Sequence, residues 1–551
     1  MRFTSSKSDF LSRARFIALL AVGCMALVSV TVAQTPVTIY NFNGTNDVAT
    51  PVPFGVTVQG RDGNLYSAAH GGGAFGGGGV YVVTPAGKET VIFNFPLSYG
   101  SSCQAGLTLG NDGNLYGDCF GGGTNGFGLL YKVTPKGVLT ELHNFTGTGG
   151  DGTNPNGPPA VAKDGNLYGV TQFGGANGQG SIYKLTPSGT VTTLYSFAGG
   201  SVGSNPSAPL IQGSDGNLYG PTLFGGTSGA GTIFKISLAG VLTTLHTFNN
   251  TDGNEPVGAL VQGTNGSFYG TTNQGGTNHE GTVFRLTANG QFTLLHSFNV
   301  ATDGMNPQTA LVQATDGNFY GTTDNYLDTH DTIFKITPGG TFSVVHTFDG
   351  NSATLGIGLA SGLVQHTNGL LYGATNASTG PGNGSIYKLN LGGKAFVRTA
   401  QSSGAVGASI GMFGQGFSSS SVVKFDGVQA TGVHLQGTTY LTVSVPGGAL
   451  TGSVTVTTGS AVLTSNAIFK VTPKITSFTP PQGAVGASVV INGSSFTQAT
   501  KVTFGGVSAT NFTVNSDIKI TAKVPTGAIT GKVAVITPGG TATSTAIFTV
   551  Q

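Results

Sequence analysis

The chain has 551 residues, of which 93 are glycine and only 8% are charged, and its formal net charge is +2. A chain of this length exceeds one hydrophobic core, so several domains are expected. The low charge and the absence of a basic cluster after the N-terminal segment argue against nucleic acid or an anionic membrane surface as a partner. Tryptophan is absent, so any platform for stacking sugar rings would use Tyr or Phe.

Residues 1–33 are predicted to be a signal peptide. Four basic residues come first: Arg2, Lys7, Arg13 and Arg15. The apolar run Phe16–Val32 follows, and small residues allow cleavage near Ala33. We therefore expect a secreted protein, extracellular or at the outer surface, with no membrane span in the mature chain. The alternatives are a membrane anchor, for which the apolar run is marginally long, and a lipoprotein signal at Cys24, where Ala21 replaces the usual leucine.

Residues 36–393 contain one hexapeptide seven times. Its fourth copy reads Asp215-Gly216-Asn217-Leu218-Tyr219-Gly220. The tyrosines of the copies lie 50 to 52 residues apart: Tyr66, Tyr116, Tyr168, Tyr219, Tyr269, Tyr320 and Tyr372. A fixed period of this size indicates one supersecondary unit used repeatedly. Each copy holds four short runs of strand-forming residues separated by Gly-rich turns. Four antiparallel strands per repeat predict an all-β fold that begins with a seven-bladed β-propeller.

The two ends of the repeat region predict how the ring closes. Residues 37–42 match the fourth strand of other copies but lack the first three strands of a repeat. The seventh repeat has the complementary lack, because its pattern stops after the third strand at residues 385–389. We expect residues 37–42 to complete the last blade, which leaves fewer exposed strand edges. The alternative is an open solenoid.

After residue 393 a second period appears, with an offset of 79 residues. Gly404-Ala405-Val406-Gly407-Ala408-Ser409 returns as Gly483-Ala484-Val485-Gly486-Ala487-Ser488. Each unit, at residues 394–472 and 473–551, holds about seven short strand-like runs. This size and pattern predict two immunoglobulin-like β-sandwiches after the propeller.

Both C-terminal units resemble IPT/TIG domains. The resemblance rests on one set of residues in the second unit: Ile475-Thr476-Ser477-Phe478-Thr479-Pro480, Gly483, Gly493, Phe496, Val502, Phe504-Gly505-Gly506-Val507 and Val524-Pro525. The first unit departs from this pattern at its entry, Phe396-Val397-Arg398-Thr399-Ala400. The resemblance implies an immunoglobulin-like fold for both units.

The seven repeats resemble those of secreted bacterial proteins called choice-of-anchor tandem repeat (GloVer-type) proteins. The shared motifs are Asp-Gly-Asn-Leu-Tyr-Gly, the Gly-Gly loop, Ile-Phe-Lys-x-Thr-Pro-x-Gly and Leu-His-x-Phe. The resemblance implies an exported protein and implies no particular activity. Members often end in a sorting tail, and the sequence shows none after the last strand-like run.

Cys103 and Cys119 flank one hairpin of the second repeat. Export permits a disulfide between them, and two free thiols are the alternative. Two cysteines without accompanying histidines make a poor zinc site. The sequence therefore predicts a disulfide and no metal site.

Candidate ligand-binding residues lie in loops that a propeller would gather on one face. Asp151, Asp252 and Asp303 open loops between repeats, and two loops within repeats add five further residues: His279, Glu280, Asp328, His330 and Asp331. Polar groups around a channel mouth could bind a sugar or a cation. The alternative is that these residues only make turns. Four histidines recur in the predicted fourth strands and are interpreted as partly buried structural positions: His143, His246, His296 and His346.

These observations favour a recognition or adhesion protein that binds a glycan or a protein through propeller loops. One alternative is a polysaccharide hydrolase or lyase in the propeller mouth, with Glu280, Asp328 and Asp331 as the source of a carboxylate pair. Another is a structural exoprotein without a ligand. No motif for a nucleophile or metal is present, so no catalytic residue and no cofactor is predicted. We expect a monomer.

Overall fold

A computed structural model describes residues 34–44, 47–51, 57–99, 103, 106–325, 331–348, 358–359, 361–376 and 383–551. The signal peptide predicted for residues 1–33 lies outside this part of the chain. The regular structure of the described residues consists of strands and two short 3-10 helices, η1 (Leu97–Tyr99) and η2 (Gly200–Val202). No helix among them has the length and apolar character needed to cross a membrane.

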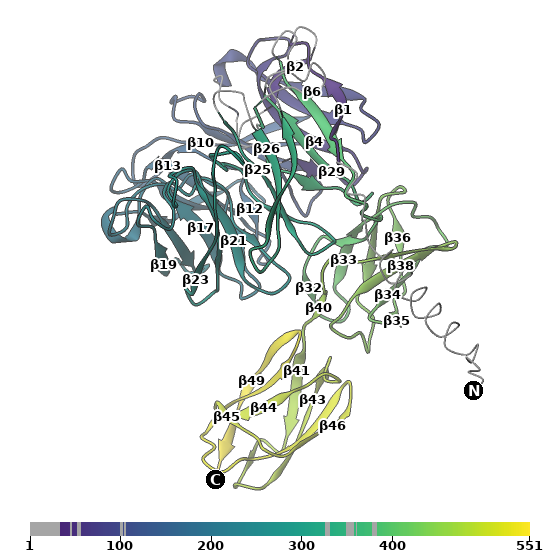
Figure 1. Ribbon diagram of the computed structural model, residues 1–551. Helices are drawn as coiled ribbons and strands as arrows, with labels where there is room; N and C mark the ends of the chain where they lie inside the picture. Colours follow the sequence, from purple (N-terminus) through teal and green to yellow (C-terminus); the bar gives the residue numbers. More distant parts are fainter. Residues whose placement is uncertain are drawn as a thin grey trace, which may run out of the picture.

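The described repeats form seven antiparallel sheets arranged as the blades of a propeller (Figure 1). The first strands are β3 (Val58–Gln59), β7 (Thr108–Leu109), β12 (Ala160–Val161), β16 (Ile211–Gln212), β20 (Val261–Gln262), β24 (Val312–Gln313) and β28 (Val364–Gln365). The second strands are β4 (Leu65–Gly72), β8 (Leu115–Cys119), β13 (Leu167–Gly174), β17 (Leu218–Thr222), β21 (Phe268–Thr272), β25 (Phe319–Thr322) and β29 (Leu371–Thr375). The predicted fold class is therefore confirmed.

The third and fourth strands complete the blades. The third strands are β5 (Gly79–Val83), β9 (Leu129–Val133), β14 (Ser181–Leu185), β18 (Thr232–Ile236), β22 (Thr282–Leu286), β26 (Asp331–Ile336) and β30 (Ser385–Leu389). The fourth strands are β6 (Glu89–Asn94), β10 (Leu139–Asn144), β15 (Val191–Ser196), β19 (Leu242–Thr247), β23 (Phe292–Ser297), β27 (Phe342–Phe348) and, in the last blade, β1 (Val37–Asn41). Two extra strands, β2 (Val48–Pro51) and β11 (Gly152–Pro155), pair with β4 and β13.

The ring closes between the last blade and the first. β1 pairs antiparallel with β30, so the beginning of the chain supplies the outer strand of the last blade. Gln59 of the first blade accepts a hydrogen bond from the backbone N–H of Thr367 at 3.1 Å and donates to its Oγ1 at 2.8 Å. The Nε2 of His366 also lies 2.8 Å from the backbone oxygen of Gly63. Closure thus depends on a strand pair and on side-chain contacts.

The repeated hexapeptide forms the turn between the first and second strands. In the fourth blade, Asp215 Oδ1 accepts the backbone N–H of Asn217 at 3.1 Å, and Oδ2 accepts the Asn217 amide at 2.7 Å and the Tyr219 hydroxyl at 2.8 Å. One carboxylate therefore holds the turn and anchors the ring that follows it. We call this end of the propeller the turn end, and the opposite end the loop end.

The glycine that ends the hexapeptide makes room for an aromatic ring. A Cβ at Gly270 would lie 2.6 Å from Cζ of Phe284 on the third strand. A Cβ at Gly169 would lie 2.2 Å from the hydroxyl oxygen of Tyr183. The aromatic rings then fill the space between neighbouring blades, and Phe248 packs edge-on against Phe284 at 5.4 Å. The core of the propeller therefore lies between the blades.

Glutamines of the first strands join neighbouring blades at the turn end. Gln262 accepts the backbone N–H of Ser214 of the preceding blade at 2.9 Å and donates to the Gly266 oxygen of its own turn at 2.9 Å. The same pair of contacts recurs at three further glutamines: Gln212, Gln313 and Gln365. Each of these amides therefore links the turn of its own blade to the turn of the preceding blade.

Two sandwiches follow the propeller. One sheet of the first sandwich has the strand order β31 (Arg398–Thr399), β33 (Ser409–Phe413), β37 (Tyr440–Ser444), β36 (His434–Leu435). Its other sheet has the order β35 (Val428–Gln429), β34 (Val422–Phe425), β38 (Val454–Thr458), β39 (Ala461–Thr464). A separate two-stranded sheet consists of β32 (Ser403–Gly404) and β40 (Lys470–Val471). The second sandwich has the sheet β41 (Lys474–Thr479), β43 (Ser488–Ser494), β47 (Lys519–Lys523), β46 (Phe512–Ser516) and the sheet β42 (Gln482–Gly483), β49 (Gly540–Val550), β48 (Gly531–Thr537), β44 (Lys501–Phe504), β45 (Val507–Ser508). Each sandwich encloses its own apolar core.

The first sandwich docks on the turn end of the propeller. Thr439 donates to the backbone oxygen of Arg61 at 2.8 Å, and Gln415 donates to Thr367 Oγ1 at 2.8 Å. The Arg61 guanidinium also lies over the Tyr440 ring at 4.8 Å. The second sandwich, in yellow, projects away from the propeller (Figure 1). The turn end is therefore partly covered, and the loop end faces away from both sandwiches.

Candidate functional site

The loops at the loop end bind to one another through their backbones. The loop between the fourth and fifth blades pairs with the loop between β21 and β22, since Asn254 and Gln274 exchange two hydrogen bonds of 2.8 and 3.0 Å. Glu255 also reaches the preceding blade, where its N–H donates to Ala230 at 3.1 Å. Because Glu255 has a φ of 54° and Pro256 follows, the loop bends over Gly231, where a Cβ would lie 2.7 Å from Pro256. Backbone hydrogen bonds therefore join this loop both to its own blade and to the preceding one.

The three loop aspartates are bound to the recurring histidines. The Nε2 atoms of His143 and His246 lie 3.1 Å from Asp151 and Asp252. His296 lies 2.5 Å from Asp303 in the same way. Each of these fourth-strand histidines is thus the partner of the aspartate in the loop that follows its strand.

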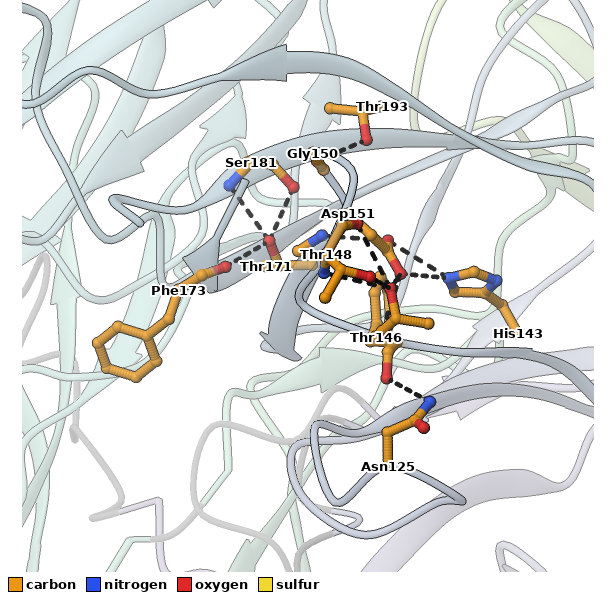
Figure 2. A network of polar contacts seen from close by, with 12 residues as sticks. Asn125, His143, Thr146, Thr148, Gly150, Asp151, Thr171, Phe173, Ser181 and Thr193 are labelled. Carbon is orange, nitrogen blue, oxygen red and sulfur yellow. Dashed lines mark hydrogen bonds and ion pairs between the residues drawn. The ribbon is translucent and has the colours of Figure 1, made fainter. Parts of the chain in front are cut away.

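Each of these aspartates also holds its own loop. Asp151 accepts the backbone N–H and the hydroxyl of Thr146, at 2.9 and 3.1 Å (Figure 2). Although burial by itself would raise the pKa of Asp151, hydrogen bonds from His143 and Thr146 lower it. In the last blade a tyrosine replaces the histidine, and Tyr40 donates to Asp47 at 2.6 Å. The aspartates therefore shape the loops, and their oxygens are already occupied.

Of the other predicted site residues, His279, Glu280 and Asp331 belong to the described part of the chain, and each has its own surroundings. Glu280 accepts the backbone N–H of Val300, while His279 is exposed on the same loop with a φ of 65°. Asp331 is buried and accepts the backbone N–H groups of Asn325 and Gly358, at 2.7 and 2.8 Å. Asp328 and His330 lie outside the described residues.

The described side chains also show no shared metal-binding arrangement. They contain no group of three or more His, Cys, Asp or Glu residues that could hold a metal ion. Cys103 and Cys119 are bonded to each other. Neither thiol is therefore free to act as a ligand.

Exposed phenylalanines are the feature of the loop end that the sequence analysis missed. The side chains of Phe75, Phe127, Phe173 and Phe224 are 58%, 43%, 41% and 44% exposed. Phe75, Phe127 and Phe224 lie in loops between the second and third strands of their blades, and Phe173 lies near the end of the second strand β13. A partial signal was present, because Phe173 and Phe224 each precede Gly-Gly at matching positions of successive repeats, whereas Phe127 does not.

Hydrogen bonds hold the backbone at three of these four phenylalanines. Phe224 exchanges two backbone hydrogen bonds with Ser204, at 2.9 and 3.2 Å. The backbone oxygen of Phe173 accepts the hydroxyl of Thr171 at 3.0 Å, and that of Phe127 accepts the N–H of Asn154 at 2.7 Å. Figure 2 shows the Phe173 ring pointing away from the polar network. Pre-positioned apolar rings of this kind can bind a partner with little ordering cost.

Comparisons with solved structures give low similarity throughout. A gluconolactonase from Xanthomonas campestris is 13% identical, covers 52% of this chain and 87% of its own, and has a TM-score of 0.34. A fungal alcohol oxidase of the AA5 family, in complex with copper, is 12% identical with coverages of 92% and 98% and a TM-score of 0.41. The surface glycan-binding protein PbSGBP-B from Prevotella bryantii is 18% identical, with coverages of 28% and 41% and a TM-score of 0.22. At this level the similarities carry no argument about activity.

Family comparisons are more informative. Among curated proteins, none matches this sequence. The IPT/TIG domain family matches residues 473–551, and the Gloeobacter/Verrucomicrobia repeat family matches residues 26–161, 142–330 and 259–411. The resemblance of the repeats and that of the second C-terminal unit are thereby confirmed, and the IPT/TIG resemblance of residues 394–472 stays a prediction. The chain belongs to the Gloeobacter/Verrucomicrobia repeat family and carries an IPT/TIG domain at its C-terminal end.

Proposed function

We propose that this chain is an exported recognition protein that binds a glycan through the loop end of its propeller. The observation that carries the proposal is the set of four exposed phenylalanines at the loop end, three of which have backbones held by hydrogen bonds. The C–H faces of a sugar ring pack against an aromatic face and bury apolar area there. The neighbouring loop amides and hydroxyls can accept and donate hydrogen bonds to sugar hydroxyl groups.

Export is supported by two features of the chain. The basic and apolar pattern of residues 1–33 is typical of a signal peptide. The bond between Cys103 and Cys119 fits an oxidising compartment.

Hydrolase or lyase activity at the loop end is not proposed, because the candidate carboxylates that the structure describes are held within the fold. Asp151, Asp252 and Asp303 bind histidines. Glu280 and Asp331 bind backbone N–H groups.

A glycan array tests the proposal with the wild-type chain and two double variants. Phe173→Ser with Phe224→Ser removes two rings of the loop end. Val138→Ser with Val241→Ser is the matched control, since these side chains are 63% and 68% exposed at the turn end. We expect the phenylalanine variant to lose binding at least about tenfold, or ~1.4 kcal/mol, while the control is unchanged.

Three outcomes would reject the proposal. The wild-type chain could bind no glycan, the two double variants could lose binding equally, or the phenylalanine variant could retain full binding. Binding to a protein panel with no glycan binding would assign the same surface to protein recognition instead. The melting temperature of each variant serves as the folding control, because neither pair of side chains is buried.

A further inference from the structure

A cavity of about 370 Å³ occupies the centre of the ring. Residues from the first strands of several blades form its wall, and the first sandwich contributes Phe396 and Arg398. Small-molecule sites commonly have volumes of ~300–1,000 Å³. The cavity is therefore large enough for a small ligand, and two parts of the chain build it.

The contribution of the first sandwich is fixed in place. The backbone N–H of Phe396 donates to the Thr367 oxygen in the turn of the last blade at 3.0 Å. Thr367 also bonds to Gln415 and to Gln59, each at 2.8 Å. Phe396 is only 4% exposed. These contacts hold Arg398, two residues further on, at the turn-end side of the cavity.

Arg398 has no carboxylate partner among the described residues. Its guanidinium lies over the Phe413 ring at 4.8 Å, and no ion pair or hydrogen bond of this side chain is found in that part of the chain. The described residues that line the cavity include no Asp or Glu. Burial lowers the pKa of Arg398 to about 10, so the group stays charged at neutral pH. A partly buried charge without a partner is costly.

An arginine at this position is found in the first sandwich, which docks on the propeller, and not in the second. The 79-residue offset aligns Arg398 with Ser477 of the second sandwich. Arg398 belongs to the entry segment that departs from the IPT/TIG pattern, and this is the segment that meets the propeller. The charge is therefore placed where the sandwich lines the cavity and is absent from the copy that does not.

Several other residues that line the cavity have polar, uncharged side chains. Asn156, Ser207 and Asn466 are among the residues that line the cavity. The Ser207 Oγ is buried without a hydrogen-bond partner, which leaves a hydroxyl available for a ligand. Amides and hydroxyls of this kind pair with ligand hydroxyl groups.

We propose that the central cavity binds a small carboxylate that also carries hydroxyl groups, such as a uronic acid, with its carboxylate on Arg398. The planar guanidinium can donate two parallel N–H groups to a carboxylate. The site is distinct from the aromatic surface at the loop end, so either proposal can hold without the other.

Calorimetric titration of the full chain tests the cavity with three compounds: D-glucuronate, D-glucose and acetate. Glucose keeps the hydroxyl groups without the carboxylate, and acetate keeps the carboxylate without the hydroxyl groups. We expect glucuronate to bind at least about tenfold more tightly than either. Equal affinities for glucuronate and glucose, or no binding of glucuronate at millimolar concentration, would overturn the proposal. Equal affinity for acetate would overturn the assignment to a hydroxyl-bearing ligand.

Two variants locate the binding. Arg398→Gln should weaken glucuronate binding at least about tenfold, and unchanged affinity would overturn the proposal. Arg285→Gln is the matched control, because Arg285 lies on a third strand and bonds to Thr293 at 3.3 Å, outside the cavity lining. The control should bind glucuronate like the wild type. If Arg398→Gln fails to fold, the wild-type comparison of the three compounds still decides the question.

Discussion

The two ends of the propeller differ in which features are the same in every repeat. At the turn end the hydrogen bonds recur even where the residue changes. Asp215 accepts the Tyr219 hydroxyl, whereas Asn265 reverses the bond and donates its amide to the Tyr269 oxygen at 2.8 Å. At the loop end the backbone bonds recur, but the projecting side chains change from blade to blade, as with Phe224 and the corresponding Gln274. Constant geometry therefore marks the scaffold, and changing exposed side chains mark the surface that we propose for recognition.

The largest effect on stability is expected at the last glycine of the hexapeptide, which packs against the core. Gly270→Ala would place a Cβ 2.6 Å from Phe284 and 2.8 Å from Leu260. Because both neighbours are buried, we expect a loss of ~1–3 kcal/mol in stability. Gly121→Ala is the matched control in a loop-end segment, where a Cβ would meet nothing within 4 Å. Thermal melts of both variants check this, and equal melting temperatures would contradict the contrast.

A smaller effect is expected for one hydrogen bond at the turn end. Tyr219→Phe removes the hydroxyl that donates to Asp215 at 2.8 Å, and we expect a loss of ~0.5–1.5 kcal/mol. Tyr195→Phe is the control, since no hydrogen bond of that hydroxyl is found among the described residues and the ring lies on an outer strand. Urea unfolding monitored by circular dichroism measures both. A control as destabilised as Tyr219→Phe would show that the bond to Asp215 is not the cause.

The smallest effect is expected for the dependence of stability on pH. Burial by itself would raise the pKa of Asp215, but hydrogen bonds from Asn217 and Tyr219 hold it below its usual value, as at three other copies: Asp112, Asp164 and Asp316. A folded-state pKa below the unfolded value of about 3.9 stabilises the protein above that pH, and the stabilisation is lost as the pH falls through the folded pKa. Because Asp215 is exposed, we expect only about 0.5 kcal/mol from one copy.

Asp215→Asn isolates this effect. The substitution recreates the form found at Asn265, which keeps the turn without a charge. The wild type should melt higher than the variant at neutral pH, and the difference should shrink as the pH falls below about 4. A difference that does not change with pH would contradict the role given to the carboxylate.

Most of the fold could be predicted from the sequence, because the repeat period of about 51 residues shows which strands belong to the same blade. The sequence also held the closing strand, since residues 37–42 resemble the fourth strands. It did not reveal that the loop aspartates and the fourth-strand histidines are partners. A local signal existed, because each histidine precedes its aspartate by six to eight residues, and Tyr40 precedes Asp47 by seven.

The rest of the candidate sites depends on distant contacts. Whether Phe173 and Phe224 are exposed follows from how neighbouring blades pack, which the Phe-Gly-Gly motif alone does not specify. The position of Arg398 follows from the docking of the first sandwich, where Thr439 meets Arg61 across 378 positions of the chain. No local pattern encodes a contact over that separation. The departure of the 396–400 segment from the IPT/TIG pattern was the only trace of it in the sequence.

Hydroxyl-radical footprinting tests the central claim, that recognition occurs at the loop end. The oxidation rate of individual side chains is measured by mass spectrometry, with and without the glycan that binds best on the array. We predict slower oxidation of Phe75, Phe127, Phe173 and Phe224 in the complex, with Val138 unchanged. Protection of Val138 at the turn end, or no change at all four phenylalanines, would contradict the account.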